Sequence, residues 1–523
     1  MEWFQNGWGV TLATFLPMVG VAAMLFIPPA QDRLIKLVGT IFAGLTLLVG
    51  IVLLFQFDYG SAGTLQLGTN LDWIPQIGSR YHVGVDGISL PLLELSVLVC
   101  FLCTIYLWWH VPAPGKIKAL LSLVLLLETG MNGSFVALDL ILFFVFWELV
   151  LVPMYFMIGI WGGPRRQYAA VKFFLYTLFG SIFMLLGFLA IYFKSGATTF
   201  DMVTLRAQAA QGGALGSTLF QNLTFLGLFL GFAIKVPMWP FHTWLPDAHT
   251  EAPTIGSVLL AAILLKMGTY GFIRIAIPLL PQAAHDFAPL IGILAVIAII
   301  YGALCCFAQS DLKRLIAFSS VGHMGFVMLG ISTLTSQGIN GAIFGMVAHG
   351  LITGMLFFLV GSIHERYHTR EISDLGGVLQ QIPRFGTLLT YTAIASLGLP
   401  GLAGFWGEML ALLGAYHPAI GLSPVLFRIL MVGAGIGTVL TAGYFLWMLQ
   451  RVNMGRVPEK FAAPGRIFDV QRLEWFAWTP LLVLIIVAGL YPKMILSVTN
   501  GAVQALVVHV GAALHAGSTV ALH

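Results

Sequence analysis

Charged residues are scarce in this 523-residue chain, in which aspartate, glutamate, lysine and arginine together make up 9%. A soluble protein carries about a quarter, whereas 59% of this chain is hydrophobic and its mean hydropathy is +0.93. The apolar runs are continuous over about 20 residues, which excludes the alternating strands of a β-barrel. The sequence therefore predicts an all-α polytopic membrane protein.

Cysteine is also rare, with four residues in the chain. Cys100 and Cys103 form a C-x-x-C pair, which is used in redox and metal chemistry. The pair lies inside a continuous apolar stretch without a nearby histidine or acid, which favours small packing residues instead. An iron–sulfur cluster would need four such ligands, so we expect no cofactor in this chain.

A strong charge of either sign is missing as well, because the net charge is only +4. The chain has no run of basic residues and no soluble domain, so we expect no nucleic-acid partner. No basic segment precedes the first apolar run, which we therefore interpret as a true first span and not a cleaved signal.

Fourteen apolar spans are predicted, with centres near residues 18, 46, 98, 126, 148, 180, 230, 264, 298, 322, 351, 400, 437 and 486. Loops after odd-numbered spans hold 17 of the 25 Lys and Arg residues, and loops after even-numbered spans with the C-terminal end hold 6. The positive-inside rule then predicts odd-numbered loops in the cytoplasm and both termini outside.

Two predicted spans are interrupted by helix breakers near their centres. Span seven contains Pro237 and Pro240, and span twelve contains Pro400 and Gly401. Broken helices at corresponding positions indicate inverted repeats. We therefore predict two inverted five-helix repeats, each with one broken helix, in the order 1–115 (spans one to three), 116–277 (first repeat), 286–450 (second repeat) and 451–523 (span fourteen and tail).

Ionisable side chains are predicted deep inside several spans. A charge at a helix centre costs about 2.5–3.5 kcal/mol on insertion scales, so such residues are functional candidates. Static ion pairs or satisfied core histidines are the alternative interpretation. The candidates are Glu148, Lys235, Lys266, His323, His349 and Glu408, with Glu128 as a seventh nearer a span boundary.

These residue types suit proton transfer, because buried lysine and glutamate shift toward neutrality and histidine titrates near neutral pH. A second polar group, His242, Asp247, His249 and Glu251, could hold a metal. It lies in a proline-rich stretch, so we interpret it as capping and surface hydrogen bonding at a cytoplasmic turn.

Several stretches identify the chain with a known family. FFVFWELVLVPMYFMIGIWGG, GFAIKVPMWPFHTWLPDAHTEAPT, LLAAILLKMGTYG, QSDLKRLIAFSSVGHMGF, AHGLITGMLFFLVG and GLPGLAGFWGEML resemble the antiporter-like subunits of respiratory complex I, which are similar to Mrp-type antiporter subunits. The resemblance implies that Glu148 and Lys235 form a proton-loading pair and that Lys266 is the central relay. It implies further that His323 and His349 continue the path to Glu408.

The twelfth-span position distinguishes branches of that family. Most branches carry lysine there, and the M-type branch carries glutamate, as this chain does at Glu408. The short tail after span fourteen also fits the M-type branch, because L-type subunits continue into a long lateral helix.

The resemblance implies partners and a location. Subunits L and N would lie on either side in a membrane arm, with a smaller subunit K beyond N. FMN, iron–sulfur clusters and quinone would reside in partner subunits, and the membrane would be a bacterial inner membrane. Three alternatives stay open: a Mrp antiporter or membrane-bound hydrogenase subunit, a solute carrier with a midplane site, and a structural spacer.

Overall fold

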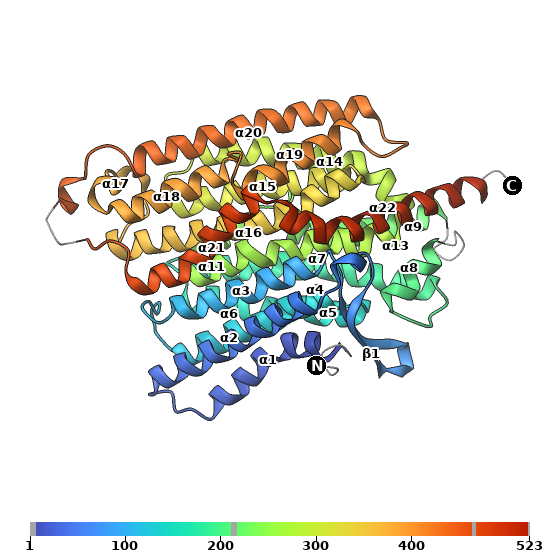
Figure 1. Ribbon diagram of the computed structural model, residues 1–523, viewed down its shortest axis with the longest axis horizontal. Coiled ribbons are helices and arrows are strands. Elements are labelled where there is room, and N and C mark those ends of the chain that lie inside the picture. Colours follow the sequence, from blue (N-terminus) through green and yellow to red (C-terminus); the bar gives the residue numbers. More distant parts are fainter. Residues whose placement is uncertain (1–6, 211–216, 463–466, 521–523) are drawn as a thin grey trace.

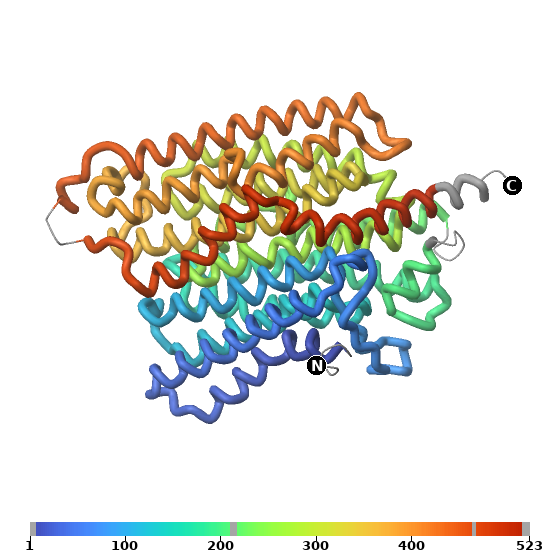
Figure 2. Tube along the Cα trace, in the orientation of Figure 1, coloured from blue at the N-terminus to red at the C-terminus, as the bar shows by residue number. Residues whose placement is uncertain are grey.

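The computed structural model describes residues 7–210, 217–462 and 467–520. Long helices run side by side along the longest axis, as Figure 1 shows, and the trace in Figure 2 follows the same bundle from the N-terminus to the C-terminus. One end of the bundle carries a β-hairpin, and we call it the hairpin end. The other end, where odd-numbered spans meet their loops, is called the basic end.

The N-terminal unit consists of three helices and the hairpin. Its elements are α1 (Gly9–Leu25), α2 (Asp32–Gln56), the 3-10 turns η2 (Tyr59–Ser61) and η3 (Pro75–Ile77), strands β1 (Gln66–Ile74) and β2 (Ser79–Val85), and α3 (Leu90–Tyr106). The strands pair antiparallel, with Leu71 opposite Tyr81. The hairpin was not predicted from the sequence, which left residues 58–86 as a loop.

The first repeat follows as a series of short and long helical segments. They are α4 (Ile117–Val136), α5 (Leu140–Leu149), α6 (Leu151–Trp161), α7 (Arg166–Lys194), α8 (Met202–Ala210), α9 (Thr218–Lys235), α10 (Trp244–Glu251), α11 (Thr254–Leu259), η4 (Leu260–Leu264), α12 (Leu265–Gly271), η5 (Phe272–Ala276) and α13 (Ile277–Leu279). Segments η4 and η5 are π-helical.

The second repeat and the C-terminal helices complete the chain. They are α14 (Pro281–Phe307), α15 (Leu312–Ser332), α16 (Ser336–Tyr367), η6 (Ile372–Asp374), α17 (Val378–Gln381), α18 (Pro383–Ser396), α19 (Ala403–Tyr416), α20 (Pro424–Val452), η7 (Glu459–Phe461), α21 (Arg472–Leu490) and α22 (Lys493–Val520). Helix α22 begins at Lys493 and includes most of the tail after Ser497, to which the sequence assigned no structure.

The fourteen predicted spans are confirmed by the helices of the described residues. Twelve of these helices are long and apolar enough to cross a membrane, and one of the twelve belongs to α22. The other eleven helices coincide with eleven of the predicted spans. The remaining three predicted spans are the shorter helices α1 and α3 and the broken helix α18–α19.

Both predicted breaks are present, and the described residues contain further irregularities. Span seven breaks between α9 and α10, and span twelve breaks between α18 and α19, where Gly398 and Gly401 adopt φ of 85° and 96°. Left-handed backbone of this kind favours glycine. Span five is also interrupted, at Val150 between α5 and α6. Span eight contains the two π-helical segments, which often mark functional sites.

Two isolated β-bridges relate the repeats to each other. In the first repeat, Asp139 lies just before the second helix and bridges to Asp201, which follows the third helix. In the second repeat, Asp311 lies just before the second helix and bridges to Glu371, which follows the third helix. Asp139 and Asp311 also cap the helices that follow them. The first bridge lies at the hairpin end, next to Ser79. The second lies at the basic end, because Asp311 follows α14, the ninth span. The repeats are therefore inverted relative to one another.

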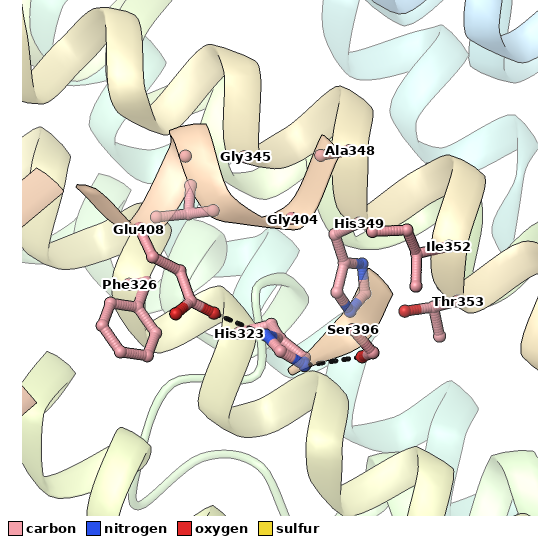
Figure 3. Close-up of a pocket in the computed structure, with 12 residues that line it drawn as sticks. His323, Phe326, Gly345, Ala348, His349, Ile352, Thr353, Ser396, Gly404 and Glu408 are labelled. Carbon is pink, nitrogen blue, oxygen red and sulfur yellow. Dashed lines mark hydrogen bonds and ion pairs between the residues drawn. The ribbon is translucent and has the colours of Figure 1, made fainter. Parts of the chain in front are cut away.

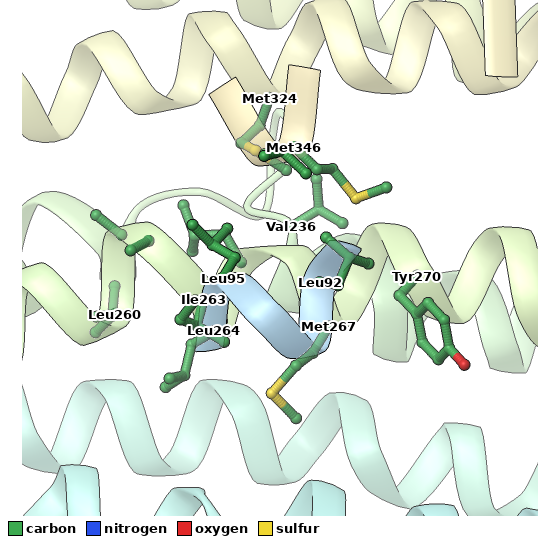
Figure 4. Close-up of a cluster of buried hydrophobic side chains, with 14 of the residues drawn as sticks. Leu92, Leu95, Val236, Leu260, Ile263, Leu264, Met267, Tyr270, Met324 and Met346 are labelled. Carbon is green, nitrogen blue, oxygen red and sulfur yellow. The ribbon is translucent and has the colours of Figure 1, made fainter. Parts of the chain in front are cut away.

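The core lies along spans eight, ten and eleven. In their most apolar windows 94%, 89% and 94% of residues are buried, against 39% in α7 and 28% in α20. Figure 4 shows the centre of this core, where Leu260, Ile263 and Met267 of span eight lie close to Leu92 and Leu95 of α3. The most deeply buried helices are those that carry Lys266, His323 and His349.

Candidate functional site

Lys266 is the central residue of the site. It is the second residue after the π-helical segment η4 and is fully buried. Its Nζ lies 2.5 Å from the Ala261 carbonyl oxygen, within that segment, and 2.6 Å from Nδ1 of His349 on α16. A buried ammonium needs such acceptors, because an unpaired charge in an apolar interior is costly.

A small cavity lies on the other side of His349. Its volume is about 30 Å³, and its polar lining comes from His323, His349, Thr353, Ser396 and Glu408. One water needs roughly 10–15 Å³ of such space, so about two water molecules fit. Nε2 of His349 is buried without a hydrogen-bond partner in the described part of the chain. Figure 3 shows this ring directed into the space that His323 and Ser396 border.

His323 and Glu408 form a hydrogen-bonded pair beside the cavity. Nδ1 of His323 lies 3.2 Å from Oε1 of Glu408, and Nε2 lies 3.1 Å from the Ser396 hydroxyl. The second carboxylate oxygen of Glu408 accepts from Thr438 on α20 at 3.4 Å. The His323 and His349 rings are 5.7 Å apart. Four of the predicted residues thus form one row: Lys266, His349, His323 and Glu408.

The break in span seven holds Lys235 close to this row. Lys235 is the last residue of α9 and is 2% exposed. Helix α12 approaches the break so closely that a Cβ at Gly268 would lie 2.8 Å from the Phe232 carbonyl oxygen and 3.0 Å from the Val236 nitrogen. Because Gly268 has no side chain, span eight can contact the break in span seven near Lys235 and Lys266.

The Trp147 ring contacts Lys235 and comes directly before Glu148 in the chain. Lys235 Nζ lies 4.9 Å from the centre of the Trp147 ring, a cation–π contact. Trp147 in turn donates its Nε1–H to the Ser181 hydroxyl at 2.9 Å. No ion pair within 4.0 Å joins Glu148 to Lys235 among the described residues, and Oε1 of Glu148 has no hydrogen-bond partner there. The two residues are neighbours of one ring and not a closed pair.

Glu128 stands apart from the row. It lies in α4, is fully buried, and neither carboxylate oxygen has a hydrogen-bond partner within the described ranges. Cys100 and Cys103, also fully buried, lie in α3 as free thiols. No hydrogen bond or ion pair joins Glu128 to Lys266 or to the histidines of the row among the described residues.

The interpretation of the His242–Glu251 group is partly wrong. Asp247 does pair with Lys172 at 2.7 Å, and Glu251 accepts from the Arg165 nitrogen at 2.9 Å. His242 and His249, however, are buried rather than at a surface. His249 stacks on Phe357 of α16 at 4.5 Å, because α10 folds back into the bundle against α7 and α15. No group of three metal-ligating side chains occurs among the described residues.

A larger cavity opens at the basic end. Its volume is about 880 Å³, and its lining includes Lys313, whose Nζ donates to the Ala252 carbonyl at 2.5 Å. His110 lies there 3.4 Å from Glu365, and burial lowers the pKa of His110. This cavity borders the turn between α10 and α11, directly after His249.

Sequence reasoning missed several polar groups of the site. Ser396 and Thr438 hold the His323–Glu408 pair, and the Ala261 carbonyl holds Lys266. Ser396 precedes the predicted break in span twelve, so its place beside a wet gap was a usable signal. Nothing in the sequence around Ala261 indicates a π-helical segment.

A polytopic bundle with inverted repeats, broken helices and a buried row of Lys, His and Glu is typical of ion-translocating, antiporter-like membrane proteins. Residues 137–436 match the family described as NADH:quinone oxidoreductase/Mrp antiporter, TM. The match covers more than half of the chain, so the chain belongs to this family.

Individual relatives agree with the family over nearly the full length. NADH-quinone oxidoreductase subunit M of Rhodobacter capsulatus is 42% identical over 509 residues, which cover 95% of this chain and 96% of the relative. The NAD(P)H-quinone oxidoreductase chain 4 3 of Trichormus variabilis is 41% identical, with 93% and 89% covered. Both relatives carry names of respiratory-type quinone oxidoreductase subunits.

Two solved structures share the fold. A chain of respiratory complex I from Thermus thermophilus with bound NADH superimposes with a TM-score of 0.84 at 31% identity, covering 96% of this chain and 100% of that one. A chain of the membrane-bound sulfane sulfur reductase, an archaeal respiratory membrane complex, gives a TM-score of 0.80 at 23% identity and covers 96% and 99%, which supports the fold alone.

Proposed function

We propose that this chain is the proton-translocating membrane-arm subunit M of NADH-quinone oxidoreductase. The observation that carries the proposal is the contact of Lys266 with His349 at 2.6 Å, followed by the cavity and the His323–Glu408 pair. Similarity to subunit M over 95% of the chain supports the assignment to that complex rather than to a Mrp antiporter.

In the proposed mechanism, the proton passes through the two nitrogens of His349. The Lys266 ammonium donates to Nδ1, and the imidazole then releases the proton on Nε2 into the cavity. Histidine suits this step because its two nitrogens can act as acceptor and donor in turn. A water in the cavity would pass the proton to His323 and Glu408, which are already hydrogen-bonded to each other.

Loading of the row is proposed to depend on Glu148 and Lys235. In this structure the Trp147 ring contacts Lys235 and adjoins Glu148 in sequence, so the pair is open. Closing the Glu148–Lys235 pair would stabilise the charged forms of both side chains. Opening the pair would leave Lys235 in contact with the ring, which favours release of the lysine proton. Glu128 is retained as a candidate carboxyl outside the row.

The proposed setting follows from the family. Subunits L and N would flank the chain in the membrane arm, with subunit K beyond N, while FMN, iron–sulfur clusters and quinone would lie in partner subunits. The basic end would face the cytoplasm of a bacterial inner membrane, with both termini outside, because the positive residues gather there. The division into 1–115, 116–277, 286–450 and 451–523 is proposed with the repeats.

The test uses the assembled complex in inverted membrane vesicles. Glu148→Ala, Lys235→Ala and Lys266→Arg are compared with Lys194→Ala, a lysine in the last turn of α7. We expect fewer protons transferred per NADH oxidised in the first three variants and no change in the control. Arginine stays charged, so full transfer by Lys266→Arg with normal assembly would refute deprotonation at this site.

The same experiment separates the alternatives. A structural spacer predicts normal proton transfer in all variants that assemble. A Mrp-type role predicts cation-dependent proton exchange without NADH, and a solute carrier predicts uptake by the chain alone. Each of these results would contradict the proposal.

A further inference from the structure

Glu94 is an ionisable residue in the membrane that the proton row does not use. It lies one turn into α3, near the hairpin end, and is partly buried. Its Oε1 is buried without a hydrogen-bond partner, and no cation pairs with it within 4.0 Å, both statements holding for the described residues. A charge in this position is costly unless something outside the chain pairs with it.

The surrounding backbone makes room for this carboxylate. A Cβ at Gly50 of α2 would lie 2.7 Å from Oε2 of Glu94, so the bare helix surface allows the close approach. Tyr59 lines the same cavity, but its hydroxyl already donates to the Leu54 carbonyl at 2.8 Å. Glu94 therefore presents an unused acceptor to the cavity.

That cavity is a long apolar slot between α2, α3, α16, α21 and α22. Its volume is about 510 Å³, within the range of roughly 300–1,000 Å³ common for ligand sites. It begins near Tyr59 and Glu94 and extends to Leu351 and Leu484. Leu351 lies 15 residues into α16, roughly 22 Å from its hairpin end. The slot thus passes the middle of a bilayer core of about 30 Å.

An apolar slot with one carboxylate near its outer end matches an amphiphile with a cationic head and a long chain. An ammonium group has three donors and no acceptor, which complements an unpaired carboxylate. A head group that carries only negative charge would instead be repelled by Glu94. Membrane aminophospholipids combine a primary ammonium with acyl chains of the required length.

We propose that this slot binds an aminophospholipid of the leaflet at the hairpin end, with its ammonium on Glu94 and one acyl chain between α3, α16 and α22. On α16, Val347 and Leu351 line the slot, whereas Ala348 and His349 line the small cavity. The bound lipid would therefore lie against the face of α16 opposite His349. The proposal is independent of the proton path.

The test measures lipid retention by the full chain in detergent with native mass spectrometry. The probes are phosphatidylethanolamine and phosphatidylglycerol with identical acyl chains. We expect one retained phosphatidylethanolamine, preferred about tenfold over phosphatidylglycerol, as a charge-assisted hydrogen bond would give. Glu94→Gln should remove the preference, and Leu351→Trp should remove the retained lipid by filling the slot.

The controls decide between this site and ordinary surrounding lipid. Asp72→Asn changes an exposed carboxylate of the hairpin and should leave the preference unchanged. Leu98→Trp is a second slot-filling variant in case Leu351→Trp fails to fold. Equal retention of both lipids by the unmodified chain, or a preference that survives Glu94→Gln, would overturn the proposal. So would retention unaffected by a folded slot-filling variant.

Discussion

The contact between spans seven and eight at Gly268 gives a sharp prediction about how closely Lys235 and Lys266 must be held. Substituting Gly268→Ala places a Cβ 2.8 Å from the Phe232 carbonyl oxygen, 2.8 Å from a Val236 methyl and 3.0 Å from the Val236 nitrogen. Two of these three neighbours are backbone atoms, which cannot rotate away as a side chain can. Helix α12 and the break after α9 must therefore move apart.

The expected cost follows from overpacking. Extra atoms in a well-packed core destabilise by about 1–3 kcal/mol, while alanine in a helix gains about 1 kcal/mol over glycine. At Gly435 in α20 no atom lies within 4 Å of an added Cβ, so only the gain applies there. Gly268→Ala should thus lower stability and Gly435→Ala should leave it equal or higher, although both are glycine-to-alanine changes within helices.

Two measurements check this reasoning on the assembled complex. The thermal unfolding midpoint should fall for Gly268→Ala and not for Gly435→Ala, and proton transfer per NADH should fall only for Gly268→Ala. The reasoning is refuted if the two variants have the same midpoint. If stability falls and proton transfer per NADH does not, the spacing of Lys235 and Lys266 is not critical.

Three further predictions concern other polar contacts. Ser396→Ala removes the hydrogen-bond partner of His323 Nε2, so it should destabilise the protein by about 1 kcal/mol and lower proton transfer. The control is Thr387→Ala on the same helix, whose hydroxyl bonds only the Pro383 carbonyl and which should leave proton transfer unchanged. Equal proton transfer by the two variants would contradict a role for Ser396. Arg366 and Glu474 form an ion pair 2.6 Å apart, and both side chains are almost fully buried. Arg366→Gln should therefore destabilise the chain by about 3–5 kcal/mol, as measured by thermal unfolding. A variant of unchanged stability would show that the pair contributes little. Burial opposes ionisation of Asp201 at the hairpin end, but hydrogen bonds from His82 and Thr204 outweigh burial and lower the pKa of Asp201. The ionised Asp201 therefore stabilises the folded protein at pH values above the pKa of an unfolded aspartate, near 3.9. This stabilisation is lost as the pH falls through the lower pKa of the folded state. Asp201→Asn should lack this stabilisation at pH 6 and lose less than the unmodified chain between pH 6 and 3, and parallel curves of unfolding midpoint against pH would contradict it.

The spans and the buried row were predictable because each depends on local composition. An apolar run of about 20 residues specifies a span whatever its neighbours are, and Lys266 or Glu408 stands out within such a run by its cost alone. The breaks at Pro240 and Gly401 were predictable for the same reason, since proline and glycine act on their own helix.

Features that depend on distant contacts were not predictable. His249 follows a proline-rich stretch that reads as a turn, and only its stacking on Phe357, more than a hundred residues later, reveals that it is buried. The π-helical segment at Ala261 likewise has ordinary helix formers in its sequence, LAAIL. The contact of the Lys235 ammonium with the Trp147 ring, in place of an ion pair with Glu148, likewise depends on side-chain placement that no pattern of residue types specifies.

The inverted repeats place comparable pairs in different arrangements within one chain. Each repeat sets a titratable residue of its second helix near one of its broken fourth helix: Glu148 with Lys235, and His323 with Glu408. In the second repeat the two side chains are 3.2 Å apart, while in the first repeat no ion pair within 4.0 Å joins them among the described residues and Lys235 contacts the Trp147 ring. Lys266, on the fifth helix of the first repeat, contacts His349 of the second repeat at 2.6 Å. One repeat is therefore open where its counterpart is closed, and the Lys266–His349 hydrogen bond carries the row of polar residues from the first repeat into the second.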